Sequence, residues 1–263
     1  PCERAPDGCP LLDFVRIEGG SFMMGDQRGN PDSNAIPIHM VTLPSFEIMR
    51  TEVTVSMYRA CVNAGACTEP NCVGDSTVGN NYCNYGANAS DYPVNYISWY
   101  QINDFAAWVG ARLPTEVEWE YTARGQGQNI IYPWGNTSPT CTLVDYNGST
   151  CGVGTSPGCA HPTGNIAQGV CDMAGNVWEW TQDEWHTNYN DAPSDGRGWC
   201  TGECPVNASD ANYDANNNTN RVMRGGRWSG GGRLHTTNRD NGNPSSRNNA
   251  YGGRLIKSLP LTP

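Results

Sequence analysis

The fold is decided by one short stretch, Arg112-Leu113-Pro114-Thr115-Glu116-Val117-Glu118-Trp119-Glu120-Tyr121. Thr115, with Glu118 three positions later, forms a capping-box pair, which predicts that a helix begins after Thr115. The acids of its first turn are favoured there by the helix dipole. Glu116, Glu118 and Glu120 could instead be paired carboxylates for glycoside hydrolysis, but their spacing and their position at a helix start fit the dipole better.

Outward from this stretch, the sequence predicts a few short elements joined by long loops. Ser98 with Gln101 begins a second capped helix, and Thr54 can cap another that ends at Gly65. Alternating apolar residues predict strands at 14–17, 21–25, 41–49, 177–181, 221–228 and 253–256. This order indicates a single α+β domain spanning 14–257. A lead-in (1–13), a disulfide-rich insertion (61–92) and a tail (258–263) complete the organisation.

The charge balance limits the classes of partner. The formal net charge of −10 argues against nucleic acid or an anionic membrane as a partner, because an acidic surface repels both. There is no run of about 18 apolar residues, so we expect no transmembrane segment. The chain starts at Pro1 without a basic-then-apolar leader, which suggests a mature or trimmed chain.

Twelve cysteines, mostly in loops rich in Gly, Asn and Pro, predict disulfides. Zinc is the competing interpretation, but the four histidines are scattered and no Cys/His group has finger or ribbon spacing. The full pairing cannot be deduced from the sequence, although Cys2 with Cys9 and Cys200 with Cys204 are close enough for local bridges. We therefore expect an oxidising location: secreted, on the cell surface or on the surface of a virion.

Four phrases carry a family resemblance: residues 112–121, Tyr132-Pro133-Trp134-Gly135-Asn136, Asp172-Met173-Ala174-Gly175-Asn176-Val177-Trp178-Glu179-Trp180 and Arg224-Gly225-Gly226-Arg227-Trp228. In order and spacing the chain resembles the formylglycine-generating-enzyme, or sulfatase-modifying-factor, domain from about residue 14 to 256. The resemblance implies a C-type-lectin-like fold with two helices, short antiparallel strands and much irregular loop. Its Trp residues are expected in the core.

The same resemblance provides a test for catalysis. In the catalytic branch of the family, two cysteines after the Gly-Gly pair bind copper, and here those positions are Gly230 and His235. An imidazole beside a glycine cannot replace a copper dithiolate, so no copper is expected and the chain is predicted not to be an enzyme. The histidine-rich helical domain of the iron-dependent sulfoxide-synthase relatives is also missing. The alternative is an oxidase, or an accessory protein, with an altered active site.

The segment from Arg224 to Arg254 resembles the variable region of target proteins of diversity-generating retroelements, in which Asn codons of a template are randomised. The expected scaffold positions are Arg224, Gly225, Gly226, Trp228, Arg233, Asn238, Arg239, Pro244, Arg247, Gly252 and Arg254. The expected ligand-binding, variable positions are Ser229, Gly230, Gly231, His235, Thr236, Asp240, Asn241, Gly242, Asn243, Ser246, Asn248, Asn249, Ala250, Tyr251 and Gly253.

The chemistry of this segment fits a display surface. Arginines such as Arg239 and Arg254 can tie loops together through several fixed donors, and short polar side chains with Tyr suit an adaptable surface. The alternative is an inert Gly/Asn-rich loop. The expected function is noncatalytic binding of an unknown macromolecular ligand, a protein or a cell surface. Calcium-dependent sugar binding is a third possibility, but the Glu-Pro-Asn or Gln-Pro-Asp phrase of true lectins is missing.

The resemblance also implies structural calcium. Asn176 and Glu179, with the backbone of Val177, are candidates for one site, because calcium prefers oxygen ligands. Asp145, Tyr146 and Asn147 are weaker candidates for a second site, since Cys151-Gly152 replaces the acidic Asp-Gly phrase expected downstream. The alternative is that Asn176 caps a turn and that Glu179 pairs with an arginine.

Overall fold

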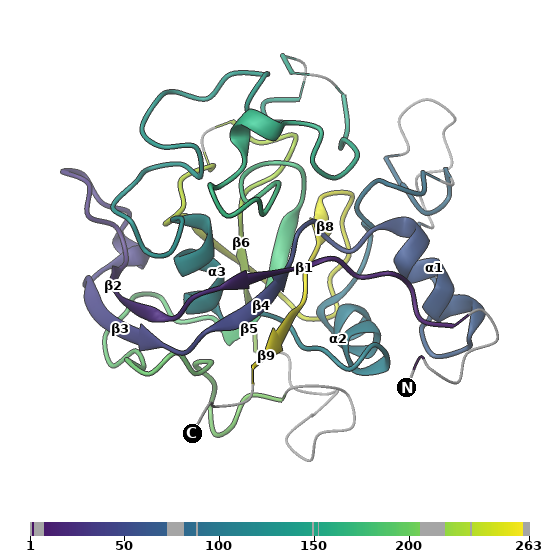
Figure 1. The fold of residues 1–263 in the computed structure, drawn as a ribbon, viewed down its shortest axis with the longest axis horizontal. Coiled ribbons are helices and arrows are strands. Elements are labelled where there is room, and N and C mark those ends of the chain that lie inside the picture. Colours follow the sequence, from purple (N-terminus) through teal and green to yellow (C-terminus); the bar gives the residue numbers. More distant parts are fainter. Residues whose placement is uncertain are drawn as a thin grey trace.

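The computed structural model describes residues 2, 8–72, 82–87, 89–148, 150–151, 153–205, 219–231 and 233–259. Part of the predicted lead-in, part of the 61–92 insertion and most of the tail lie outside the described residues. Figure 1 shows short strands and helices connected by long loops. The α+β fold class expected from the sequence is confirmed.

Three small sheets organise the described part of the chain. In the first, β1 (Phe14–Ile17), β4 (Phe46–Met49) and β9 (Ile256–Ser258) lie in the order β1-β4-β9, so the last strand pairs with one near the start of the chain. In the second, β2 (Gly20–Met24) pairs with β3 (His39–Leu43). The third has the order β7-β6-β5-β8 and contains β5 (Trp178–Glu184), β6 (Arg221–Arg224), β7 (Arg239–Gly242) and β8 (Tyr251–Gly252).

Each α-helix begins at a residue that the sequence marked as a cap. The side chain of Thr54 accepts a hydrogen bond at the start of α1 (Val55–Asn63). Complete capping boxes, at Ser98/Gln101 and Thr115/Glu118, begin α2 (Trp99–Trp108) and α3 (Glu116–Ala123). The part of the chain that is described therefore holds three α-helices, one more than the two that the resemblance implied. Two short 3-10 helices, Ser33–Ala35 and Pro162–Gly164, interrupt the loops.

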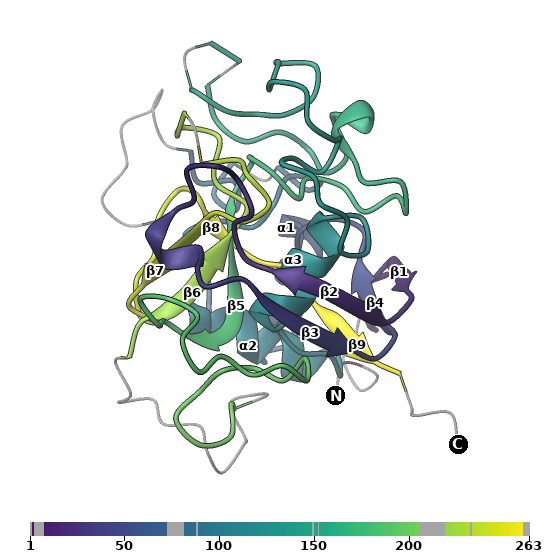
Figure 2. The ribbon, with the colours of Figure 1, turned by 90° about the vertical axis from the view of Figure 1, so that its left-hand side faces the viewer.

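Helix α3 is the central element of the fold. It packs against β2, β5 and β6, and Figure 2 shows it between the two larger sheets. All eight of its residues are buried. Trp99, Trp119 and Trp180 are fully buried and Trp178 nearly so, which confirms their core role. Trp134 differs, because it is only half-buried and stacks on Tyr132 with ring centroids 5.0 Å apart.

All twelve cysteines form disulfides, and no free thiol is present. The pairs expected from proximity, Cys2–Cys9 and Cys200–Cys204, are confirmed. The other four pairs are Cys61–Cys67, Cys72–Cys83, Cys141–Cys151 and Cys159–Cys171. Six disulfides fit an oxidising, extracytoplasmic environment. Within the described ranges, no helix has the length and apolar character needed to cross a membrane.

Candidate functional site

The segment between β6 and β9 is anchored by buried arginines. Arg224 donates to Glu120 Oε2 at 2.7 Å and to the backbone oxygens of Thr236 and Thr237 at 2.7 and 3.2 Å. Arg239 holds both carboxylate oxygens of Glu116, at 2.6 and 2.9 Å. Because both arginines are buried, these contacts fix the backbone at two points along the segment.

These pairs correct the interpretation of the α3 acids. Glu116 and Glu120 are buried partners of arginines, whereas the sequence suggested only stabilisation by the helix dipole. Burial alone raises the pKa of Glu116, but Arg239 and Arg224 outweigh burial and the net pKa is lowered. Glu118 completes the capping box and pairs with Arg112 at 2.8 Å. None of the three carboxylates is therefore free for glycoside chemistry.

The third anchor lies at the end of the segment. Arg254 is fully buried and contacts both oxygens of Glu179, at 2.7 and 2.6 Å. It also donates to the backbone oxygens of Met49, Arg50 and Cys171. The predicted bracing roles of Arg239 and Arg254 are thus supported by their contacts.

Two arginines expected in the scaffold differ from this pattern. Arg247 is exposed, yet it donates to Gln101 of the α2 capping box at 2.8 Å and so still ties the loop to a helix. Arg233 is 60% exposed at its side chain and pairs with Asp240 at 2.9 Å. Asp240 belongs to the same segment, so Arg233 does not brace the segment against the core. It belongs to the surface.

The predicted ligand-binding positions mostly reach the surface. Ser229 and Gly231 are exposed. Ten positions are half-buried, namely Gly230, His235, Asp240, Asn241, Gly242, Asn243, Ser246, Asn248, Asn249 and Tyr251. Three positions are buried, namely Thr236, Ala250 and Gly253. Thr236 donates to the Ile130 carbonyl, and a Cβ at Gly253 would lie 3.2 Å from Ile102. These three positions therefore belong to the scaffold and not to the surface.

Two polar hollows open on this segment, one on each side of Arg233. The first, of about 370 Å³, is lined by Trp178, Arg227, Gly230, Gly231, Arg233, Asp240 and Tyr251, and we call it the Arg227 hollow. Parallel pairing of β5 with β8 puts Tyr251 next to Trp178 there. The second, of about 220 Å³, is lined by Arg28, Asp32, Asn34, Arg233, His235, Asn238 and Arg239.

The two positions that decide the oxidase question line different hollows. Gly230 lies in the Arg227 hollow, whereas His235 lies in the second, and Arg233 lines both. The ring of His235 contacts the Arg28 guanidinium through Nδ1 and lies against Tyr132. Burial lowers the pKa of His235, and the positive charge of Arg28 lowers it further. The contact with the Arg28 guanidinium occupies Nδ1 of His235 and places a positive charge beside the ring, which disfavours a metal cation there.

The candidate calcium residues are engaged by protein groups. Both oxygens of Glu179 accept from Arg254, and Oε2 also accepts from Trp119 at 2.9 Å. Asn176 has a positive φ of 54°, and its Oδ1 accepts from the Ser156 N–H. This arrangement matches the alternative of a turn residue and an arginine-paired acid, and it does not fit a cation. The calcium prediction at Asn176, Val177 and Glu179 therefore rests on the resemblance alone.

At the second calcium candidate, formed by Asp145, Tyr146 and Asn147, the side chains also contact protein groups. His161 Nε2 lies 3.1 Å from Asp145 Oδ1, and the amide of Asn147 donates to Thr150. The hydroxyl of Tyr146 donates to the Pro139 carbonyl. Across the described residues, no group of three or more Asp, Glu, His and Cys side chains could hold a metal ion. We derive no metal-dependent step at either place.

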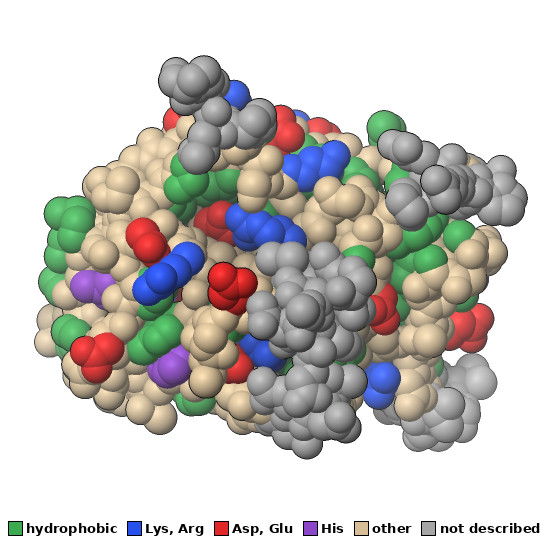
Figure 3. All heavy atoms as spheres, turned by 90° about the horizontal axis from the view of Figure 1, so that it is seen from below, with side chains coloured by type: hydrophobic (Ala, Val, Ile, Leu, Met, Phe, Trp, Pro, Cys, Tyr) green, Lys and Arg blue, Asp and Glu red, His purple; other side chains and the backbone are tan. Residues whose placement is uncertain are grey.

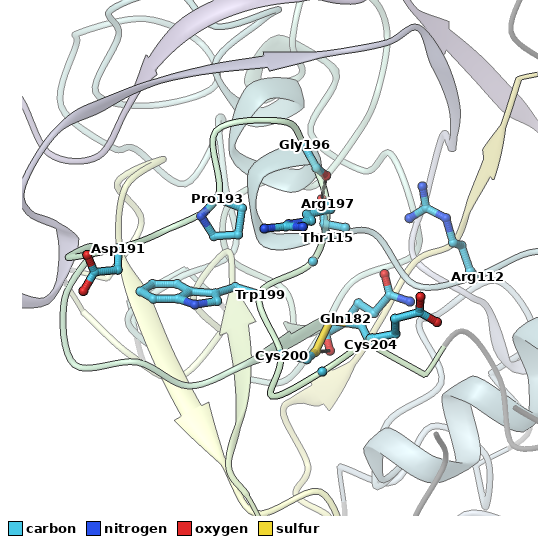
Figure 4. A pocket seen from close by; sticks show the side chains of 13 residues that line it. Arg112, Thr115, Gln182, Asp191, Pro193, Gly196, Arg197, Trp199, Cys200 and Cys204 are labelled. Atoms are coloured by element: carbon cyan, nitrogen blue, oxygen red, sulfur yellow. Dashed lines mark hydrogen bonds between the residues drawn. A yellow bond between two sulfur atoms is a disulfide. The ribbon is translucent and has the colours of Figure 1, made fainter. Parts of the chain in front are cut away.

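A larger hollow of about 740 Å³ was not predicted from the sequence (Figure 4). Its lining includes Arg112, Gln182, Trp199 and the Cys200–Cys204 disulfide, and none of the predicted binding positions. Cys204 lies two positions before 206–218, a range that the structure does not describe. We assign no function to this hollow, because its size alone indicates no chemistry.

The small sheets, capped helices and arginine-braced loops define a C-type-lectin-like fold of the formylglycine-generating-enzyme type. The chain belongs to the sulfatase-modifying factor enzyme 1-like domain family, whose description matches residues 3–259.

Three similar proteins illustrate the range of this family and fold. Hercynine oxygenase of Mycolicibacterium smegmatis is 30% identical over 215 residues, which are 66% of this chain and 50% of that protein. The chain thus spans only half of that relative. The structure of PvdO from Pseudomonas aeruginosa has a TM-score of 0.73 at 27% identity and covers 95% of both chains. Treponema denticola variable protein 1 has a TM-score of 0.65 at 22% identity and covers 94% of this chain and 95% of its own, which shows a shared fold.

Proposed function

We propose that this domain is a noncatalytic, ligand-binding protein that displays a diversified surface between β6 and β9. One observation carries the proposal: the positions of the two copper-binding cysteines are Gly230 and His235, and all twelve cysteines of the chain are in disulfides. A copper dithiolate needs two free thiolates, and this chain offers none. The name of the Treponema relative, a variable protein, agrees with the proposal but does not carry it.

The division between anchors and surface supports diversification. Buried ion pairs and backbone contacts hold the segment at Arg224, Arg239 and Arg254, so the exposed residues between them are not needed to fix its backbone at these points. Most of the predicted variable positions are exposed or half-buried. Substituting the exposed ones changes the surface and leaves the core intact, as in antibody loops, whereas a Cβ at Gly242 would lie 2.8 Å from the buried Trp180.

The ligand is proposed to be a macromolecule, either a protein or a component of a cell surface, met outside the cytoplasm or on a virion. Figure 3 shows acidic and basic side chains interspersed over one face of the molecule, without a continuous basic stripe. Together with the net charge of −10, this argues against nucleic acid as the ligand.

Natural variation tests the proposal directly. Sibling genes or isolates should differ at the surface positions and be nearly identical elsewhere, with a template repeat and a reverse transcriptase nearby. Position 250 should keep small residues, because Ala250 is fully buried. Differences spread evenly along aligned siblings would rule out diversification.

Tolerance to substitution gives a laboratory version of the same test. Ser229→Tyr, at an exposed position, should leave the melting temperature unchanged. Ala250→Tyr should lower the free energy of unfolding by about 1–3 kcal/mol or more, because a larger side chain in a filled core displaces its neighbours. For a domain of this size that is a fall of about 2–12 °C. Calorimetry of the two variants checks this, and equal melting temperatures would contradict the assignment of Ala250 to the scaffold.

The second candidate function is a formylglycine-generating-type oxidase, or an accessory protein, with an altered site. The similarity to hercynine oxygenase favours it. Its test is oxidation of a cysteine-containing peptide by the purified protein with added copper or iron, using His235→Ala as the matched variant. Metal-dependent turnover that is lost in this variant would overturn the noncatalytic proposal.

A further inference from the structure

The Arg227 hollow contains more cationic than anionic side chains, although the whole chain is acidic. Arg227 and Arg233 line it with a single carboxylate, that of Asp240. The rest of its lining is Trp178, Tyr251 and two glycines. The hollow therefore has a local positive charge on a protein of net charge −10.

The two guanidinium groups have unused donors. Arg233 contacts Asp240 through Nη1 only, at 2.9 Å. For Arg227, the described residues supply neither an ion pair nor a side-chain hydrogen bond within contact distance. A guanidinium carries five N–H donors in a planar fork that matches a carboxylate, so most of the donors of this pair are free for a ligand.

Tyr251 closes the hollow on the β8 side. Its ring packs edge-on against Trp180, with centroids 5.4 Å apart, which fixes the direction of the side chain. Burial raises the pKa of the Tyr251 hydroxyl, and Asp240 raises it further while Arg227 lowers it. The hydroxyl thus lies within electrostatic reach of Arg227 and Asp240, and it stays protonated as a hydrogen-bond donor.

We propose that the Arg227 hollow anchors an acidic side chain, Asp or Glu, of a protein ligand, with its carboxylate held by Arg227 and Arg233 and by the Tyr251 hydroxyl. This inference rests on the proposed binding function and names the chemical group that the surface takes. Arg227 and Arg233 lie outside the set of variable positions, whereas Tyr251 and Asp240 belong to it, so the two guanidinium groups stay constant while the hydroxyl and the neighbouring carboxylate can change. Diversification then selects among acidic partners and does not alter the preference for a carboxylate.

A protein is favoured over an acidic glycan as the source of this carboxylate. Arg and Tyr in a small central pocket, surrounded by flat polar residues, are typical of protein–protein hot spots. A sugar ring needs an exposed aromatic face to stack on, but Trp178 is only 3% exposed, and the half-buried ring of Tyr251 packs edge-on against Trp180. The volume of about 370 Å³ accommodates one side chain and its hydration, and not an extended chain of sugars.

Titration with small probes tests the anchor. The Nε–H signals of the arginines are followed by NMR while N-acetyl-glutamate amide, N-acetyl-glutamine amide or glucuronate is added to the intact protein. We expect saturable shifts of the Arg227 and Arg233 signals with the glutamate probe and none with the glutamine probe. Arg227→Gln should weaken glutamate binding by about tenfold or more, since a hydrogen bond to a charged group contributes about 1.5–3 kcal/mol and about 1.4 kcal/mol is tenfold. Arg197→Gln, an exposed arginine outside the hollow, is the control and should bind as the wild type does.

Each other outcome decides against part of the proposal. Glucuronate binding about tenfold tighter than the glutamate probe would assign the hollow to an acidic sugar. Shifts with neither anion, or equal binding by Arg227→Gln and wild type, would remove the anchor altogether. The proposed function would survive that failure if sibling sequences still differ at the surface positions, so the two proposals fail separately.

Discussion

Replacing Arg254 with Met should be among the most damaging single substitutions in this domain. The change leaves the Glu179 carboxylate buried without its cation, and three backbone oxygens lose a donor. Removing one partner of a buried ion pair costs about 3–5 kcal/mol. For a chain of this length that corresponds to a fall of about 6–20 °C in melting temperature, measured by calorimetry or circular dichroism.

A double variant separates the effect of charge from that of lost packing. Arg254→Met combined with Glu179→Gln should recover part of the loss, because the neutral amide removes the buried charge and its oxygen can still accept from Trp119. Arg197→Met is the control, since this arginine is 74% exposed at its side chain and should melt as the wild type does. If Arg254→Met has the same melting temperature as the control variant, the Arg254–Glu179 ion pair is not an anchor of the segment.

Complete reduction of the disulfides should unfold the domain at physiological temperature. Each disulfide joins cysteines that are 4–12 positions apart, for which loop-closure entropy gives about 2–3 kcal/mol. Six such bonds together are comparable to the whole stability of a typical domain, about 5–15 kcal/mol. We expect the near-ultraviolet circular dichroism signal to be lost in reductant and to return after reoxidation.

Variants that remove one disulfide at a time make this prediction more specific. The Cys200–Cys204 disulfide closes the shortest loop, so replacing both of its cysteines with Ser should lower the free energy of unfolding the least. The same change at Cys159 and Cys171, which close the longest loop, should lower it more. A fully reduced and alkylated chain that keeps its near-ultraviolet signal would show that the hydrophobic core suffices without the disulfides.

Local sequence signals predicted the helices well, because each depends on residues three or four positions apart. The capping boxes at Ser98 and Thr115 are examples. The arginine pairs could not be predicted in detail, because their partners are far apart: Glu116 and Arg239 are separated by 123 positions. Which carboxylate neutralises which arginine is decided only when the whole chain folds.

Which residues of the segment from Arg224 to Arg254 reach the surface was predicted less accurately, for a related reason. Irregular loops have no period of 2 or 3.6 that would separate inward from outward positions. Thr236, Ala250 and Gly253 resemble their exposed neighbours in size and polarity, yet they are buried. Arg233 resembles Arg239 in sequence, yet it lies on the surface because its acidic partner is the nearby Asp240.

The pairing of β9 with β4 has an architectural consequence. Strand β6 lies before the segment and pairs on both sides, with β5 and β7, while β9 follows the segment and pairs with β4 at the edge of the first sheet. The segment is thus an exchangeable cassette with clamped ends, and not a free tail. A foreign loop set inserted between Arg224 and Ile256 would inherit its spacing and its direction from the host, provided that it keeps Arg239 and Arg254. Under the proposed binding function, the domain serves as a display scaffold whose frame and surface loops can change at different rates.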